Sequence, residues 1–207
     1  MAKKKSKTKK RAKNGKKTRT KNKTPAKSRV KTKSVRRKLT RAKAKTAKPK
    51  ALPAVPSITS LPSIEVETTS SGRLQLAALK GKNVVLYFYP KDDTPGCTTE
   101  GCDIRDHYAE FRKLDAVVYG VSRDAIDSHE RFKTKFGFPF ELIADPDEKL
   151  CRAFGVIQQK SLYGRTYLGV DRSTFIFDRA GMLRKSFRGV KVPGHVDQVL
   201  GELRKLR

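Results

Sequence analysis

The sequence predicts one α/β domain that follows a long basic segment. Three observations support this prediction: the composition changes sharply after residue 50, buried-type strands alternate with stretches of helical periodicity, and two adjacent strands and a helix close the chain. Strands that alternate with helices favour a central sheet with helices packed on its faces. We therefore expect a three-layer α/β architecture for the folded part of the chain.

The basic segment covers residues 1–50, which hold 25 Lys and Arg residues and no Asp or Glu. The whole chain has 49 basic and 20 acidic residues, so residues 51–207 keep 24 and 20, and the net charge of +29 divides into +25 and +4. With few apolar side chains, residues 1–50 cannot offset the entropy of ordering, which predicts disorder. Residues 51–63 contain three prolines and no charge, which predicts an extended linker before a domain at 64–207.

The first elements of the domain follow from local pattern. The segments IEVE and RLQL flank a TTSSG turn, which predicts a small hairpin beginning at Ile64. Residues 83–89, NVVLYFY, form a continuous β-branched and aromatic run that is typical of a strand covered on both faces, and Pro90 ends it. Apolar residues at helical spacing predict a helix over 97–114.

The alternation continues to the C-terminus. We predict a buried strand at 116–122, a helix at about 125–136, a strand at 140–145, a helix at 147–154, strands at 173–178 and 183–190, and a last helix from His195. The final two strands are joined by the turn Arg179-Ala180-Gly181. A hairpin and a terminal helix after the alternating part complete the expected α/β domain.

Several classes of protein are excluded by the sequence. No window approaches the roughly 18 to 20 consecutive apolar residues of a membrane span, and no apolar region of a secretory signal follows the basic start. Organelle transit peptides are rich in Arg and Ser, whereas this segment is mostly Lys. Three cysteines are too few for a secreted disulfide scaffold and favour a reducing compartment, so we expect a cytoplasmic protein without membrane contact.

The Lys clusters of residues 1–50 are separated by Ala, Thr and Ser, and this composition resembles the tails of linker histones and of some bacterial nucleoid proteins. A flexible polycation gains affinity for DNA or RNA by releasing counterions from phosphates, without reading bases. We expect non-specific nucleic-acid contact, and hence association with the nucleoid, or with the nucleus in a eukaryote. A solvated charge run or a localisation signal remains the alternative.

The chemistry is concentrated where the first buried strand joins its helix, in the segment Pro90-Lys-Asp-Asp-Thr94-Pro-Gly-Cys97-Thr-Thr-Glu100-Gly-Cys102. A cysteine in the first turn of a helix faces unpaired backbone N–H groups and the positive end of the helix dipole, which favour thiolate over thiol. Thr94 offers a hydroxyl to the same small volume. An anion or a polar oxygen would fit there.

The pattern P-x3-T-x2-C, formed by Pro90, Thr94 and Cys97, resembles the active-site motif of peroxiredoxins. The wider string FYPKDDTPGCTTEGCDIRD is similar to the peroxiredoxin Q subfamily, also called bacterioferritin comigratory protein, and the likeness runs from about residue 61 to the C-terminus. The resemblance implies a thioredoxin-like fold with a central mixed sheet. It also implies an antioxidant peroxidase that reduces hydrogen peroxide and organic hydroperoxides, takes electrons from thioredoxin or a similar dithiol, and needs no cofactor.

The same resemblance implies a role for each residue of the site. Cys97 matches the peroxidatic cysteine, Thr94 the hydroxyl that orients the substrate, and Pro90 the residue that shields the pocket. Arg172, directly before the strand STFIFD, matches the active-site arginine, which would stabilise the thiolate and donate hydrogen bonds to the peroxide. Cys102 matches the resolving cysteine.

Formation of a disulfide between Cys97 and Cys102 requires a conformational change of the helix that carries them. In an unbroken helix the Cα atoms of residues five apart lie about 8 to 9 Å from each other, whereas a disulfide needs less than about 7 Å. The start of the helix must therefore unwind, and Gly101 lowers the barrier by its poor helix propensity. Because the disulfide is intramolecular, no dimer is needed, and we expect a monomer.

The remaining candidates have weaker patterns. Cys151 has no motif around it and is expected to be a buried structural thiol. Glu100 and Asp106 could orient Arg172 or merely cap the helix. The three histidines share no ligand spacing, so we expect no metal site.

Two other functions stay open at this point: a thiol redox sensor, and a nucleic-acid-associated structural protein whose domain only packs or oligomerises. The intact set of Pro90, Thr94, Cys97 and Arg172 argues against the structural protein.

Overall fold

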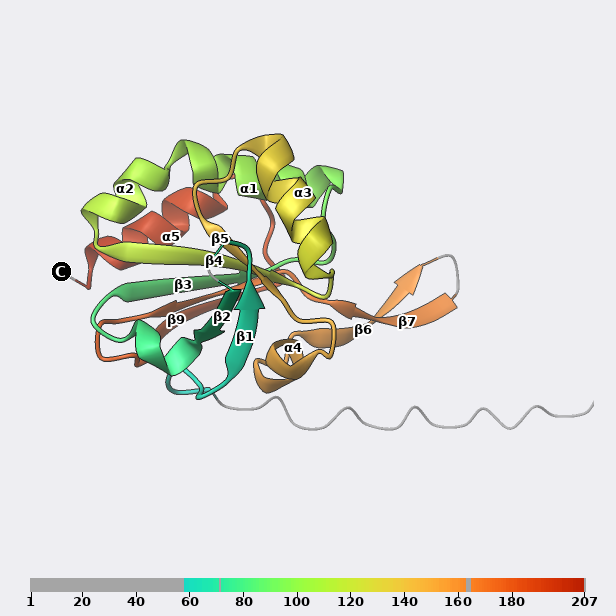
Figure 1. The fold of residues 1–207 in the computed structure, drawn as a ribbon, viewed down its shortest axis with the longest axis horizontal. Coiled ribbons are helices and arrows are strands. Elements are labelled where there is room, and N and C mark those ends of the chain that lie inside the picture. The colour runs from blue at the N-terminus through green and yellow to red at the C-terminus, as the bar shows by residue number, and fades with distance from the viewer. Residues whose placement is uncertain (1–57, 71, 163–164, 207) are drawn as a thin grey trace, which may run out of the picture. The chain divides into compact units, whose positions relative to one another are not determined.

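The computed structural model describes residues 58–70, 72–162 and 165–206. The basic segment 1–50 and the first part of the expected linker, up to residue 57, lie outside the described residues. The described elements, shown in Figure 1, are β1 (Glu65–Thr68), β2 (Gly72–Gln75), the 3₁₀ helix η1 (Leu76–Leu79), β3 (Asn83–Phe88), α1 (Pro95–Asp106), α2 (Tyr108–Lys113), β4 (Ala116–Ser122), α3 (Ile126–Phe136), β5 (Glu141–Ala144), α4 (Lys149–Ala153), β6 (Ile157–Leu162), β7 (Arg165–Val170), β8 (Ser173–Phe177), β9 (Leu183–Arg188) and α5 (His195–Arg204).

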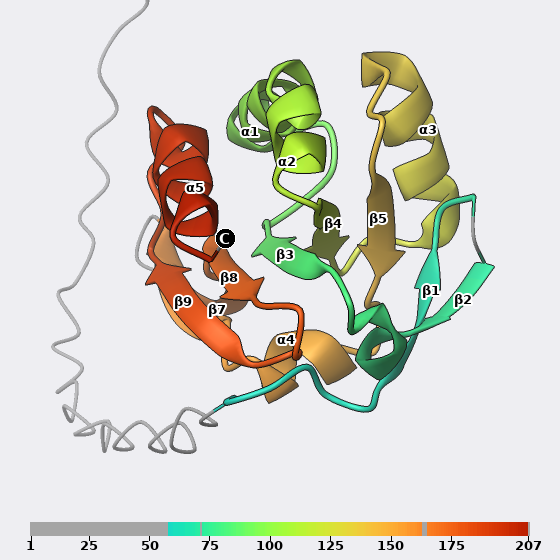
Figure 2. The same cartoon turned by 90° about the vertical axis from the view of Figure 1, so that its left-hand side faces the viewer.

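A seven-stranded mixed sheet forms the middle layer, in the order β2-β1-β5-β4-β3-β8-β9. The β3–β4 and β4–β5 pairs are parallel, and the other pairs are antiparallel. Figure 2 shows α1, α2, α3 and α5 on one face of the sheet and α4 on the other. The three-layer α/β architecture is therefore confirmed.

Helices on both faces explain why β3 is a continuous apolar run. All six residues of β3 are buried, and the side chains of the five that follow Asn83 alternate between two hydrophobic clusters. Val85 and Tyr87 belong to the cluster beneath α1, α2, α3 and α5, whereas Val84, Leu86 and Phe88 belong to the cluster on the α4 face. A strand covered on both sides has no face for polar residues. The strand that leads into Cys97 thus lies at the centre of both clusters.

The structure differs from the sequence prediction at the expected helix 97–114, which is divided into α1 and α2 at His107. His107 has φ −98° and ψ 6°, and its carbonyl accepts the first backbone hydrogen bonds of α2, from Glu110 and Phe111. The apolar spacing pointed to the correct buried side, since Ile104 and Phe111 are both buried. Periodicity alone did not show the break.

Two other regions were not predicted correctly. Strands β6 and β7 form a hairpin that projects from the body of the domain (Figure 1), and their exposed, mixed polar side chains gave no alternating pattern. At the other end, Leu61 is buried and its N–H donates to Gly181 O at 2.8 Å. The packed chain therefore begins earlier than residue 64, within the segment assigned to the linker.

Gly101 has a packing role that the sequence did not reveal. It is buried on α1, and a Cβ atom added there would lie 2.5 Å from Cζ of Phe138, inside any real contact distance. The absence of a side chain is what allows α1 to lie against the Phe138 ring. No described helix is long and apolar enough to cross a membrane.

We predict that Gly101→Ala destabilises the domain by about 1 to 3 kcal/mol, because overpacking forces the Phe138 ring or the helix to move. Gly201→Ala in α5 is the matched control: apart from the adjoining residues and backbone of its own helix, nothing lies within 4 Å of its added Cβ, and it should stabilise by about 0.5 to 1 kcal/mol through helix propensity. Urea midpoints of both variants check this. Equal midpoints would contradict the packing role of Gly101.

Candidate active site

Cys97 lies in the first turn of α1, where the local sequence sets its environment. Thr94 is the N-cap residue with extended backbone, and Pro95 occupies the first helical position, where its missing N–H costs no hydrogen bond. Cys97 is therefore the third helical residue. Its backbone N–H is among the donors that an α-helix leaves unpaired at its start, and the positive end of the helix dipole lies beside its sulfur. The side chain is buried, with 3% of its surface exposed.

Arg172 reaches the same place from the position directly before β8, the strand that neighbours β3 in the sheet. Strand β8 pairs antiparallel with β3, with Ser173 opposite Phe88, so the residue before β8 lies beside the loop that leaves β3. The Nη2 of Arg172 lies 3.3 Å from Cys97 Sγ, within reach of a hydrogen bond to sulfur. Burial opposes the charge of Arg172, but Glu100 and Cys97 raise its pKa, so the group stays a cation.

Glu100 completes this arrangement from one turn further along α1. Its Oε2 accepts a hydrogen bond from Nη1 of Arg172, so the two arms of the guanidinium contact Glu100 and Cys97 separately. Burial raises the pKa of Glu100 to about 7, although Arg172 acts in the opposite direction. Asp106, the other acid considered from sequence, is exposed and pairs with Arg105. Of the two acids, the structure brings only Glu100 to Arg172.

A tyrosine that sequence analysis did not single out lies at the base of the site. Tyr87 is buried on β3, and its hydroxyl has no hydrogen-bond partner among the described protein atoms, as is also true of Glu100 Oε1. Burial raises the pKa of Tyr87 well above its usual value, and Glu100 and Cys97 add to this effect. The phenol is therefore neutral. Its position in the apolar run of β3 hid it from pattern analysis.

The loop residues of the motif are placed differently. Thr94 Oγ1 donates to Lys91 O at 3.0 Å, so its hydroxyl hydrogen is used within the loop while its oxygen can still accept. Thr94 and Pro90 are both partly exposed. The structure thus brings Cys97, Arg172 and Glu100 into direct contact and places Thr94 and Pro90 along the loop that leads to them.

The three cysteines have distinct surroundings, and all three are free thiols. Cys102 lies on α1 with Cys97 and is partly buried against the cluster on that face of the sheet. Because α1 is continuous from Pro95 to Asp106, a bond between these two sulfurs requires the helix to unwind. Cys151 is fully buried on the opposite face, and burial raises the pKa of its thiol strongly.

A second group of buried polar residues lies between the β3–α1 loop and α3, and the sequence analysis did not predict it. Asp92 of the loop contacts His129 of α3, which is fully buried. One signal was available: His129 and Phe132 are three apart in the α3 pattern, so both occupy its inward side. Across the described ranges, no three His, Cys, Asp or Glu side chains are grouped to hold a metal ion.

Comparisons with known proteins agree with this geometry. A family model described as the AhpC/TSA family matches residues 59–186. Peroxiredoxin Bcp of Bacillus subtilis (strain 168) is 46% identical over 145 residues, which are 70% of this chain and 92% of the relative.

Solved structures give the same result. Xanthomonas campestris peroxiredoxin Q aligns with a TM-score of 0.68 and 45% identity over 72% of this chain and 96% of its own. A structure of the X. campestris bacterioferritin comigratory protein, studied for its alkyl peroxide reduction activity, aligns with a TM-score of 0.67 and 44% identity over 72% of this chain and 97% of its own.

Proposed function

Because this chain belongs to the AhpC/TSA family, in its Bcp/PrxQ peroxiredoxin subfamily, we propose that the contact between Cys97 and Arg172 is the centre of its peroxidase activity. The domain has the thioredoxin-like fold of this subfamily. The protein is a thioredoxin-dependent thiol peroxidase that reduces alkyl hydroperoxides. Hydrogen peroxide is the smaller substrate that we assign to the same site. The distance of 3.3 Å from Arg172 Nη2 to Cys97 Sγ is the observation that carries the assignment.

Cys97 acts as the nucleophile in this proposal. Its thiolate attacks the terminal oxygen of ROOH, an S–OH bond forms as the O–O bond breaks, and RO⁻ leaves and takes a proton from water to become the alcohol. Negative charge moves from sulfur toward the peroxide oxygens during this step. A fixed guanidinium beside both groups stabilises that charge more in the transition state than before it.

Glu100 is a positioning residue for Arg172. Its hydrogen bond to Nη1 fixes one arm of the guanidinium, which leaves Nη2 directed at Cys97 Sγ. Of the two roles left open for Glu100, the buried contact favours orientation over capping. The Thr94 oxygen would accept a hydrogen bond from the bound peroxide, because its own hydrogen is donated to Lys91 O, and Pro90 would shield the loop from water.

Cys102 returns the enzyme to its starting state. After α1 unwinds, the Cys102 thiolate attacks the sulfur of the Cys97 sulfenic acid, the S–S bond forms, and hydroxide leaves and is protonated to water. Thioredoxin then reduces this disulfide by thiol exchange. Since both cysteines belong to one chain, we propose that the cycle runs in a monomer.

We predict that Cys97→Ser abolishes the first oxidation, because a serine hydroxyl has no accessible anionic form. Cys102→Ser should react once with peroxide but should not turn over with thioredoxin, and it should over-oxidise. Cys151→Ser, the matched control on the other face of the sheet, should complete the full cycle. Mass spectrometry after one equivalent of peroxide and NADPH consumption with thioredoxin and its reductase measure the two steps.

Loss of the first oxidation in Cys97→Ser and Cys102→Ser alike would contradict this assignment of roles. One stoichiometric oxidation of the unaltered protein without sustained NADPH consumption would favour a redox sensor instead.

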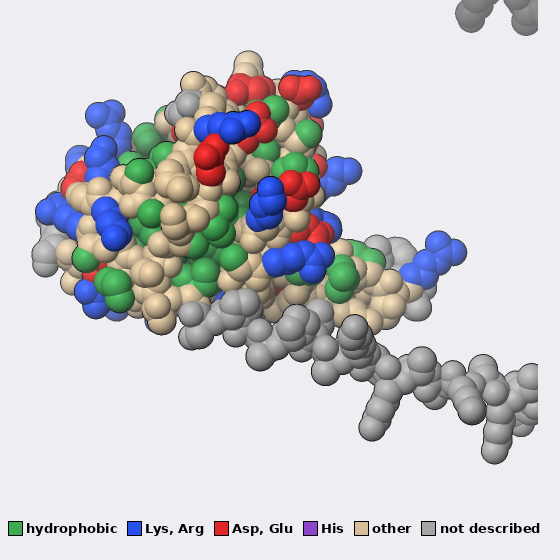
Figure 3. Space-filling model, turned by 60° about the horizontal axis from the view of Figure 1, so that its bottom comes forward, with side chains coloured by type: hydrophobic (Ala, Val, Ile, Leu, Met, Phe, Trp, Pro, Cys, Tyr) green, Lys and Arg blue, Asp and Glu red, His purple; other side chains and the backbone are tan. Residues whose placement is uncertain are grey.

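We further propose that residues 1–50 bind DNA or RNA without sequence preference and, in a bacterial host, associate the enzyme with the nucleoid. Composition supports this proposal, because the segment supplies +25 of the net charge of +29. Residues 51–207 hold 24 basic and 20 acidic residues and contribute only +4. On the face shown in Figure 3, Lys and Arg side chains lie among Asp and Glu side chains.

Deletion of residues 1–50 should sharply weaken binding to duplex DNA while leaving the rate of peroxide reduction unchanged. If about six charges of the full chain meet phosphates, the logarithm of its binding constant should fall with log salt at a slope near −5. Titrations of both proteins with DNA across a salt series, with peroxidase assays in parallel, check this. Salt-insensitive binding, or equal affinity after deletion, would contradict the proposal.

A further inference from the structure

A buried ion pair joins α3 to the loop that precedes Cys97. None of the peroxidase steps described above uses it. His129 Nδ1 is 2.9 Å from Asp92 Oδ2, and His129 Nε2 is 3.0 Å from Ile143 O. A carbonyl oxygen and an ionised carboxylate can only accept hydrogen bonds, so both ring nitrogens of His129 carry hydrogen. The pair is therefore an imidazolium and a carboxylate, both almost completely removed from solvent.

Asp92 is held by further contacts from the residue that follows β3 and from the turn that precedes α3. Tyr89 Oη donates to Asp92 Oδ1 at 2.8 Å, and the backbone N–H of Asp92 donates to Asp124 Oδ2 at 2.8 Å. Burial raises the pKa of Asp92, but the hydrogen bond and charge of His129, together with hydrogen bonds from Ser128 and Tyr89, lower it by more, so the net shift is downward and the carboxylate is ionised. Both the backbone and the side chain of Asp92 are thus fixed by neighbouring elements.

Because Asp92 lies just before α1, its contacts determine where this helix starts. Only Asp93, in a left-handed conformation with φ 52°, lies between Asp92 and the N-cap residue Thr94. Fixing Asp92 therefore fixes where α1 starts and where the sulfur of Cys97 lies relative to Arg172. Near the other end of α1, Arg105 Nη1 donates to Phe136 O at 2.8 Å. Both cysteines of the proposed disulfide lie between these two attachments.

We propose that the Asp92–His129 pair is a positioning device for the peroxidase centre proposed above. It holds the start of α1 so that Cys97 meets Arg172, and it stays in place while α1 unwinds to join Cys97 and Cys102. A buried pair suits this task because separating it leaves an uncompensated charge in an apolar interior, which makes the attachment hard to break. Asp92 and His129 touch no substrate and act only through the loop.

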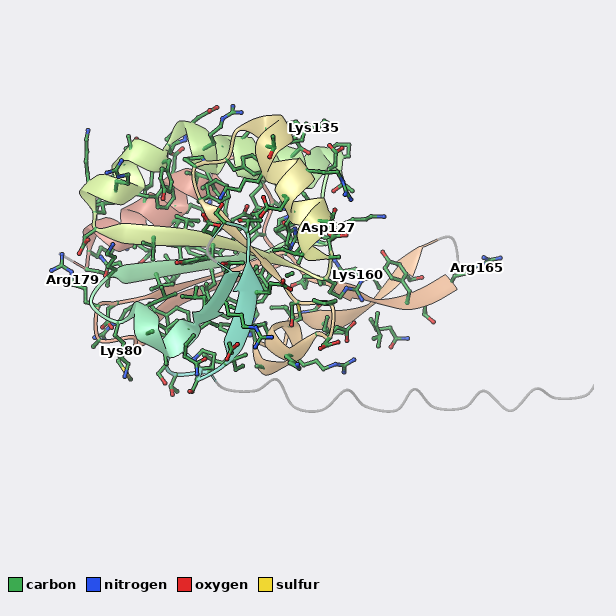
Figure 4. All side chains as sticks on the ribbon, in the orientation of Figure 1. Lys80, Asp127, Lys135, Lys160, Arg165 and Arg179 are labelled. Carbon is green, nitrogen blue, oxygen red and sulfur yellow. The ribbon has the colours of Figure 1, made fainter. Side chains whose placement is uncertain are left out.

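The chain contains a matched control. Lys135, on the same helix α3, forms an ion pair with Asp93, the next residue of the same loop, at 2.6 Å, but both side chains are more than half exposed. Figure 4 labels Lys135 on α3. Exposed pairs of this kind contribute little to stability or positioning. The Lys135–Asp93 and His129–Asp92 pairs thus join the same two segments and differ in burial.

The test measures two reactions of Cys97 in full-length Asp92→Asn, His129→Asn, the double variant and Lys135→Ala. One is the rate constant for a single oxidation by hydrogen peroxide, which needs an aligned Arg172. The other is alkylation by iodoacetamide, which does not. We expect Asp92→Asn and His129→Asn each to slow the peroxide reaction roughly 10- to 100-fold while alkylation changes far less, because misplacement penalises the oriented reaction. The double variant should lose no more than the slower single variant, and Lys135→Ala should react like the unaltered protein.

Folded Asp92→Asn or His129→Asn that reacts with peroxide at the unaltered rate would overturn the proposal, as would equal slowing of peroxide and iodoacetamide. Equal peroxide rates for the unaltered protein and Cys97→Ser would instead refute the peroxidase centre itself.

Amide hydrogen exchange on the unaltered protein decides the matter if the variants do not fold. Oxidation should expose the amides between Thr94 and Cys102, while the N–H groups of Tyr89 and Asp92 keep their protection. Loss of protection at Tyr89 and Asp92 together with α1 would overturn the proposal.

Discussion

The contact between the Arg172 guanidinium and the Cys97 sulfur is the constraint on which the site depends. The two residues lie 75 positions apart, and the fold joins them through one pair of neighbouring strands. Because β8 runs antiparallel to β3, the residue that precedes β8 meets the loop that follows β3. The apolar residues that pair these two strands therefore also bring together the loop leading to the nucleophile and the position of the cation.

Burial has two effects on this centre. It strengthens the attraction between Arg172 and a thiolate, since interactions between charges are weaker in water. It also makes every charge there depend on a partner, which explains why the charged residues occur in pairs. Glu100 of α1 accompanies Arg172, and His129 of α3 accompanies Asp92 of the loop before α1. The first half of α1 begins three residues after Asp92 and contains Glu100, and it is the part that must unwind for Cys102 to reach Cys97.

The sequence predicted features that depend on local patterns better than contacts between residues far apart in the chain. Strands β3 and β4 were predicted with errors of at most one residue, because burial on both faces leaves a local signature. Cys97 could be named from its motif, and Arg172 from its position before a strand that resembles the corresponding strand of the family. The Asp92–His129 contact could not be predicted, since it joins residues that are 37 positions apart and share no sequence pattern. The β6–β7 hairpin was not predicted either, because strands with little buried surface show no alternation of apolar and polar residues. Gly101 was interpreted through helix propensity, while its contact with Phe138 depends on a neighbouring helix and loop.

The most direct test of the central claim is the rate constant for a single oxidation of Cys97 in Arg172→Lys. A lysine ammonium keeps the charge but cannot bridge Glu100 and Cys97 with two fixed arms. The account predicts that this rate falls by roughly 10²-fold or more, as when one oriented donor is removed from a charged transition state. A rate within a few-fold of the unaltered protein would show that charge alone is sufficient, and it would contradict the role given to the Glu100–Arg172–Cys97 geometry.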